Sequence, residues 1–342
     1  LVLAAGVDRM ENGRFRASAQ VPIVEELLPT SGSAQTSGRP FTVLTAEGEN
    51  TFAAVPGLQS KTQWTLFYGQ VKTLLFSWDL AVNGIRGTLD AFRRHPDIPP
   101  QAHVFLVKEE ASTMLSHSLW HKGIPGSSLM EFFHEKGKGD QAFPRDIWEL
   151  ARDIEAKTQD AFIPLLSYDQ AEETFVIRGL GVFHHDRLVG ELSGEEARMF
   201  GLLSGKTLNA YLYQLVPGYG GITMRRVRSK TKIGLKKSGI GPVLTINVKV
   251  RGILGESAKI AVDLSREERK RICRAFSVFL EREMKKTLQK LQALNSDLLA
   301  LGEVYRVHYP LAWEPTEWER LYPQIPVELS VDFLLENSGV MR

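Results

Sequence analysis

Near the start of the chain, residues 1–8 form a mostly apolar run, and polar and apolar residues alternate along residues 14–23. They flank a turn-like stretch in which Asn12-Gly13 supplies the positive φ angles that a tight hairpin turn requires. The pattern therefore predicts that a β-hairpin opens the fold.

Strand-like and helical patterns then follow one another as far as residue 107. Because a hairpin combined with helices is typical of mixed sheets, we expect an α+β fold rather than a purely parallel α/β fold. The expected strands are residues 41–45, 64–68 and 103–107, the expected helical segments are 46–58 and 71–94, and the Ser-, Thr- and Gly-rich residues 29–40 are expected to form an exposed loop.

The second half of the chain contains another predicted hairpin and a long amphipathic helix. The hairpin covers residues 174–192, with His185-Asp186 at its turn, and a helix that Gly205 ends follows it. A capping box formed by Ser265 and Glu268 begins the long helix, predicted at about residues 265–301. We expect this helix to lie across a sheet made of strands from residues 209–250 and 327–335, because its apolar residues recur at three- and four-residue steps. They are Ile272, Phe276, Phe279, Leu280, Met284, Leu288, Leu291 and Leu298.

Length and composition indicate an ordinary globular chain with more than one domain. The 342 residues, 43% of them hydrophobic, exceed the usual size of one domain, so two or three are expected. No apolar run approaches the roughly 18 consecutive residues that a transmembrane helix needs. Residues 1–5 are apolar but follow neither a Met nor a basic flank, so they predict a strand, and we expect a targeting segment upstream of Leu1.

The single cysteine, Cys273, excludes a disulfide framework and a cysteine metal site. It lies in the predicted long helix, where a cysteine behaves as a small apolar residue. We therefore assign it no chemistry.

Positive charge is concentrated in the C-terminal part of the chain, although the net charge is only +2. Between residues 218 and 251 there are nine Lys or Arg residues and no acid. The run is typical of a solvated sheet face or of an edge protected by charge, and an acidic partner or an anionic lipid surface is the functional alternative. Nucleic acid is not favoured, because no aromatic residues are interleaved for base stacking. The candidate surface consists of Arg226, Arg228, Lys230, Lys232, Lys236 and Lys237.

Patterns that resemble nucleotide and metal sites lack required parts. Residues 201–207 have three residues between Gly201 and Gly205, where a phosphate-binding P-loop has four, and they follow a helix rather than a strand. His117 and His121 have the four-residue spacing of a helix face, and His184-His185-Asp186 is a second cluster, but neither has further ligands close in sequence. We also expect the two adjacent histidines to point to opposite faces of the hairpin.

No catalytic pattern appears elsewhere. A G-x-S-x-G elbow is absent, and acidic pairs such as Glu109-Glu110 lie where helix starts favour acids. The sequence therefore predicts no enzyme activity, no catalytic residues, no metal and no cofactor.

Three segments together resemble the Ger(x)C family of spore germination proteins. The first, residues 5–8 and the hairpin, is similar to the family's opening strand, which normally follows a lipidated Cys. The middle segment resembles the pattern G-x-x-V-F-x-x-D-x-L-V-G-x-L-x-x-x-E at residues 179–196. The last resembles the signature D…G…R…P-x-x-W…W…P, at Asp297, Gly302, Arg306, Pro310, Trp313, Trp318 and Pro323.

The resemblance implies a lipoprotein on the outer face of the inner spore membrane, made with a signal peptide that is removed. It implies a non-catalytic C subunit of a nutrient germinant receptor, with an integral membrane A subunit and a transporter-like B subunit as partners. The glycines, tryptophans and prolines of the patterns suit turns and packing, and no reactive group is among them.

The resemblance also implies three domains, each a mixed β-sheet with packed helices. We expect them at residues 1–120, 121–205 and 206–342, with the first two interleaved if the second hairpin returns to the N-terminal sheet. The alternative function is a small-molecule-binding protein or an enzyme with an unrecognised pocket. A deep cleft that gathers titratable groups from different segments would favour that alternative.

Overall fold

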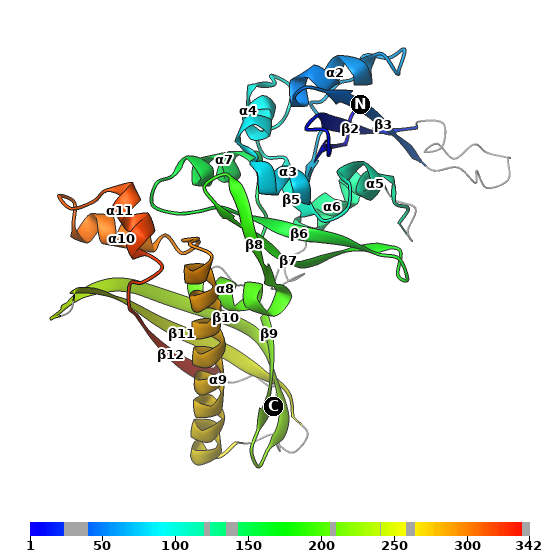
Figure 1. Ribbon diagram of the computed structural model, residues 1–342. Coiled ribbons are helices and arrows are strands. Elements are labelled where there is room, and N and C mark those ends of the chain that lie inside the picture. The colour runs from blue at the N-terminus through cyan, green and yellow to red at the C-terminus, as the bar shows by residue number, and fades with distance from the viewer. Residues whose placement is uncertain are drawn as a thin grey trace. The chain divides into compact units, whose positions relative to one another are not determined.

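The computed structural model describes residues 1–23, 40–119, 124–134, 143–205, 210–239, 241–257 and 264–336. The chain divides into two compact units, each with its own β-sheet (Figure 1). The N-terminal unit is Leu1–Lys138, Ala142–Ala156 and Ala161–Glu191, and the C-terminal unit is Gly139–Gln141, Lys157–Asp160 and Leu192–Arg342. Both sheets mix parallel and antiparallel pairs and pack against helices, which confirms the α+β class.

The N-terminal sheet has the strand order β3-β2-β1-β4-β5-β6-β7-β8. The predicted opening hairpin is confirmed, because β1 (Ala4–Arg9) pairs antiparallel with β2 (Phe15–Pro22), which pairs antiparallel with β3 (Phe41–Gly48). In the centre, β1, β4 (Thr73–Ser77), β5 (His103–Val107) and β6 (Phe162–Asp169) run parallel. β7 (Thr174–His184) pairs antiparallel with β6, and the predicted turn at residues 185–186 leads to β8 (Arg187–Ser193).

Helices cover both faces of this sheet, because the side chains of its central strands alternate between two apolar clusters. Leu74 and Phe76 of β4 pack in a cluster with α2 (Thr51–Gln59), α3 (Trp78–Asn83), α4 (Arg86–Arg94) and α7 (Ile147–Glu155). Leu75, between them, packs in the other cluster with α5 (Ala111–Ser116) and α6 (Pro125–His134). The central strands are therefore buried on both sides.

Two local predictions in this unit are wrong. Residues 71–94 are not helical throughout, because they begin with β4, whose five residues are all buried. Such a continuous apolar run lacks the alternation that marks a half-exposed strand. Residues 64–68 form no strand, and the residues 29–39 of the expected loop lie outside the described part of the chain.

The C-terminal sheet has the order β12-β11-β10-β9. β10 (Gly220–Ser238) and β11 (Gly241–Ser257) form a long antiparallel pair. β9 (Ala210–Val216) pairs antiparallel with β10, and β12 (Val327–Glu336) pairs parallel with β11. α8 (Gly194–Ser204) precedes the sheet, and its last turn ends at Gly205 in the left-handed conformation, as predicted.

The long helix α9 (Arg266–Ala293) lies across one face of this sheet (Figure 1). The ring of Phe276 stacks on that of Phe333 of β12, with 5.0 Å between centroids. The predicted capping box at Ser265 is present, and Cys273 lies half-buried on the helix, where burial raises the pKa of its thiol. The helix ends earlier than the predicted residue 301, because Asn295 has a positive φ angle of 50°. Two short helices follow, α10 (Leu301–His308) and α11 (Pro315–Leu321).

The expected division into three domains stays a prediction. Of its two versions, we keep the one in which the first two domains are interleaved. Strands from residues 1–120 and from residues 121–205 share the N-terminal sheet, whereas residues 192–205 belong to the C-terminal unit. Among the described residues, no helix combines the length and the apolar character needed to cross a bilayer.

Candidate functional site

A wide, polar cleft lies at the carboxyl ends of β1, β4 and β5 in the N-terminal unit. Its volume is about 900 Å³, and its walls come from the ends of these strands, the β1–β2 turn and α3. Small molecules bind preferentially outside the carboxyl ends of parallel strands, where several loops converge. The lining residues are Asp8, Arg9, Met10, Glu11, Asn12, Gly13, Ser77, Asp79, Asn83, Lys108, Glu109 and Glu110.

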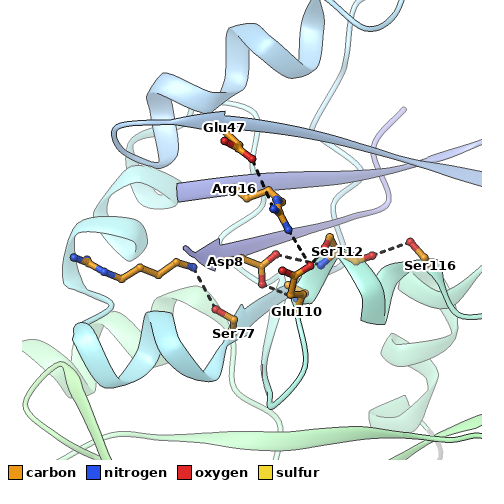
Figure 2. A network of polar contacts seen from close by, with 9 residues as sticks. Asp8, Arg16, Glu47, Ser77, Glu110, Ser112 and Ser116 are labelled. Atoms are coloured by element: carbon orange, nitrogen blue, oxygen red, sulfur yellow. Dashed lines mark hydrogen bonds and ion pairs between the residues drawn. The ribbon is translucent and has the colours of Figure 1, made fainter. Parts of the chain in front are cut away.

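Asp8, the buried carboxylate of the cleft, holds the start of α5. Its Oδ1 accepts a hydrogen bond of 2.6 Å from the backbone N–H of Ala111, and its Oδ2 accepts one of 3.3 Å from Ser112 (Figure 2). Burial raises the pKa of the Asp8 carboxyl to about 6, although both amide bonds favour the ionised form. This group therefore changes charge close to physiological pH.

Ion pairs and a second cap surround Asp8. Arg16 of β2 donates to Glu110 at 2.9 Å and lies 3.7 Å from Glu47 of β3, as Figure 2 shows. Ser77, at the end of β4, accepts hydrogen bonds from the backbone N–H groups of Arg9 and Leu80, and so caps α3. The network joins β1, β2, β3, β4 and α5 at the end of the sheet where the cleft lies.

The cleft is mainly acidic, because five carboxyl groups and only two cations, Arg9 and Lys108, line it. Lys108 lies 2.8 Å from Glu191 of β8, and the guanidinium of Arg9 lies over the ring of Phe15. The role of Asp8 could not be predicted from the sequence, since Asp8 and Ala111 are 103 residues apart. The sequence feature that could have pointed to Asp8 is an acid at the end of a buried strand, in the segment that resembles the family's opening strand.

The second candidate is the predicted cationic surface, which lies on the C-terminal sheet. Arg228, Lys230, Lys232 and Lys236 are exposed and alternate along β10, so they share one face, opposite the face that α9 covers. Lys237 belongs to the other face and lies over the ring of Tyr309, while Arg226 has a φ angle of 52° at an irregularity in the strand pairing. The structure thus brings together four of the six predicted residues on one face.

Some of these cations form ion pairs with the edge strand β12. Arg228 donates to Glu336 at 2.9 Å, and Lys236 donates to Glu328 at 2.5 Å. Within the described part of the chain, Arg226, Lys230 and Lys232 form no ion pair.

Of the predicted histidines, His117 reaches the cleft through the lining residue Glu109. The ring of His117 stacks on that of Tyr168, and its Nε2 lies 3.1 Å from Glu109. The imidazole is therefore held by a carboxylate and an aromatic ring. His121 and the residues Lys206 and Thr207 lie outside the described residues. The rings of His184 and His185 lie only 4.3 Å apart rather than on opposite faces, because His185 has a φ angle of 54° in the turn.

The residues of the C-terminal signature are joined around the start of α10. Asp297 accepts hydrogen bonds from the backbone N–H groups of Leu301 at 2.9 Å and Gly302 at 2.7 Å. A Cβ atom on Gly302 would lie 2.7 Å from the indole nitrogen of Trp318, so only glycine fits there. Trp318 also packs with Trp313, with 6.3 Å between ring centroids. These signature residues act in capping and packing.

The middle pattern has a similar structural basis. A Cβ atom on Gly181 of β7 would lie 2.4 Å from the side chain of Leu106, so the glycine allows β5 and β7 side chains to pack closely. At the following turn, Asp186 accepts hydrogen bonds from the backbone N–H groups of Ile85 and Arg86, at 2.9 and 3.4 Å. The turn therefore fixes the start of α4.

Two family models match the chain, one after the other. The model described as "Spore germination protein N-terminal domain" matches residues 1–168, and the model described as "Spore germination B3/ GerAC like, C-terminal" matches residues 178–339. Together they include every residue of the cleft and of the cationic surface.

Individual relatives are distant in sequence but similar over most of their length. Spore germination protein GerQC of Bacillus cereus is 17% identical over 301 residues, which cover 87% of this chain and 83% of GerQC. YfkR of Bacillus subtilis (strain 168) is 20% identical over 351 residues, covering 99% of this chain and 90% of YfkR. The crystal structure of the GerBC protein has a TM-score of 0.64 at 19% identity and covers 98% of this chain, a likeness of fold.

Proposed function

Because the chain belongs to the Ger(x)C family of spore germination proteins, we propose that it is a non-catalytic subunit of a spore germinant receptor. In this proposal it acts in nutrient-triggered germination at the inner spore membrane, through contacts with an integral membrane A subunit and a transporter-like B subunit. The match of two consecutive family models to nearly the whole chain is the observation that carries the proposal.

The positions of the signature residues support a non-catalytic role. Asp297 caps a helix, Gly302 makes room for an indole, and Asp186 holds a turn against α4. These are the requirements of a stable scaffold, and a scaffold that presents surfaces to other subunits needs no reactive group. The cationic surface of β10 is the proposed contact with an acidic partner or with the membrane.

A lipid anchor upstream of Leu1 is part of the same proposal. The opening strand resembles the family segment that follows a lipidated Cys, so we expect a signal peptide and that Cys in the precursor. One acyl chain gives marginal membrane binding, whereas a lipoprotein anchor with two or more chains gives stable attachment. Replacement of the Cys should release the protein from the membrane.

The acidic cleft supports the alternative, a small-molecule-binding protein or an enzyme with an unrecognised pocket. It gathers titratable groups from different segments, among them Asp8, Asp79 and Glu109. In that alternative, a variant such as D8N, which keeps the size of the side chain, changes the response to one nutrient while the protein remains assembled in the membrane.

Deletion of the gene tests the proposed role. Spores without this chain should form normally and keep their heat resistance, but should fail to lose optical density with at least one nutrient from a panel tested singly. Expression of the intact gene from another locus should restore the response. Wild-type germination of the deletion spores with every nutrient would contradict the proposal.

A further inference from the structure

The outer face of the C-terminal sheet, on the side away from α9, carries a basic centre. Along β11 the exposed residues Lys249 and Arg251 share this face with Arg228 and Lys230 of β10. Acidic side chains on the face belong to β12, where Glu328 and Asp332 alternate with buried residues. The charge therefore changes from an acidic edge at β12 to a cationic centre at β10 and β11.

Like charges stand directly opposite each other in this centre. Arg228 is the register partner of Arg251, and Lys230 is the register partner of Lys249. Glu336 lies 2.9 Å from Arg228 and 3.7 Å from Arg251 and offsets the first pair. Lys230 and Lys249 form no ion pair with any described residue. Like charges at directly opposite positions destabilise a sheet, and here the acid Asp332 of β12, the other register partner of Lys249, offsets part of that repulsion.

The other edge of the face, strand β9, exposes large rings and an aliphatic side chain. Tyr211, Tyr213 and Leu215 are 61%, 62% and 64% exposed, whereas Leu212 between them is buried. Tyr213 lies over Gly221 of β10, where a Cβ atom would come within 2.6 Å of its hydroxyl. Tyr213 is the register partner of Thr223 and Leu215 that of Gly221, so the row lies along the part of β10 that precedes Arg228 and Lys230.

We propose that this outer face, centred on Lys230 and Lys249 and carrying Tyr213 and Leu215 farther along the sheet, docks on an anionic lipid surface. The proposal rests on the proposed function, which places the protein at a membrane. Several cations spread over two strands match many phosphates in one plane, and each Lys or Arg at such a surface adds attraction. Tyrosine is favoured at the level of lipid headgroups because its ring is apolar and its hydroxyl is polar.

Vesicle binding by the full chain tests the proposal. We expect sedimentation with vesicles of phosphatidylcholine containing about a third phosphatidylglycerol, and little with phosphatidylcholine alone. The double variant K230E/K249E should lower the partition coefficient by about 30-fold or more, since each cation contributes roughly one factor of five to six. It keeps like charges opposite each other at 230 and 249 but adds a carboxylate opposite Asp332 of β12, so its thermal midpoint should fall modestly, and binding is measured well below that midpoint. Y213S/L215S should weaken binding at both low and high salt.

A matched control has the same change of charge elsewhere in the C-terminal unit. R274E/K285E alters two exposed cations of α9, on the other side of the sheet, and should change the partition coefficient less than twofold. The single variant K230E places a carboxylate opposite Lys249, so it should raise the thermal midpoint while it weakens vesicle binding. If Lys230 had only a structural role, K230E would not raise the thermal midpoint and weaken vesicle binding at the same time.

Three results would overturn lipid docking: no binding of the parent to anionic vesicles, equal binding to neutral vesicles, or unchanged binding of K230E/K249E. If K230E/K249E binds vesicles as the parent does but no longer assembles with other subunits, the face docks on an acidic protein instead. The proposed function is judged separately by the germination of spores, so lipid docking can fail while the receptor role stands.

Discussion

Asp8 and Asp297 are buried carboxyl groups that each hold the start of a helix, one in each unit. Burial raises the pKa of Asp297 to about 7, although the amide bonds from Gly302 and Leu301 favour its ionised form. The neighbouring carboxylate Asp160 also raises this pKa and accepts a hydrogen bond of 2.9 Å from the Asp297 backbone N–H. Helix capping by these groups thus depends on protonation.

The raised pKa of Asp297 makes the stability of the C-terminal unit depend on pH. Because the folded protein holds this proton more tightly than the unfolded chain, its contribution is complete below the usual pKa of 3.8 and is lost as pH rises through 7. In urea titrations at a series of pH values, the free energy of unfolding of D297N should therefore fall less from about pH 4 to 7 than that of the parent.

The exposed acid Asp332 of β12 supplies the control for this titration. D332N removes one carboxylate from the same unit and so measures the effect of losing a charge alone. Parallel curves for the parent and D297N would show that Asp297 does not titrate in this range.

At the scale of elements, the contact between α10 and α11 is the tightest point of the signature region. A Cβ atom at Gly302 would lie 2.7 Å from the Trp318 indole and 3.0 Å from the Thr158 carbonyl oxygen. G302A should lower the free energy of unfolding by about 1–3 kcal/mol, the usual effect of overpacking a filled core. Urea denaturation followed by tryptophan fluorescence measures it.

The control for G302A is a helical glycine with free space around it. At Gly87, the second residue of α4, a Cβ atom would meet nothing within 4 Å, so G87A should not destabilise the protein and should add at most about 0.5 kcal/mol of stability. A stability of G302A equal to that of the parent would mean that α10 and α11 separate easily, contrary to the packing described above.

Elements with a local signature could be predicted from the sequence. Asn12-Gly13 and His185-Asp186 fix two hairpin turns, and the Ser265–Glu268 capping box fixes the start of α9. The strand β4 was missed because its burial on both faces depends on helices far along the chain, and a buried apolar run alone does not distinguish a strand from a helix.

The candidate sites also contain features that the sequence predicts and features that it does not. The cations of β10 could be predicted, because alternation along one strand decides which side chains share a face. The pairing of Lys230 with Lys249 could not be predicted, since the sequence of either strand alone does not fix the register between two long strands. The Asp8 network joins residues about a hundred positions apart, which no local pattern reveals.

At the scale of the whole molecule, the two units present different chemistry. The N-terminal unit offers an open acidic cleft, whereas the C-terminal unit offers a cationic sheet face beside exposed tyrosines. In the proposed receptor, this arrangement gives the subunit two separate surfaces for contacts. A protein with that role is recovered together with the membrane subunits it contacts.

Affinity purification from detergent-solubilised inner spore membranes tests the central claim most directly. With a tag on this chain, quantitative mass spectrometry should find two integral membrane proteins, one of them transporter-like, in amounts close to that of the chain itself. A variant unable to fold, used as the control, should recover neither. Recovery of the folded chain without any integral membrane protein would contradict the assignment of this protein as a receptor subunit.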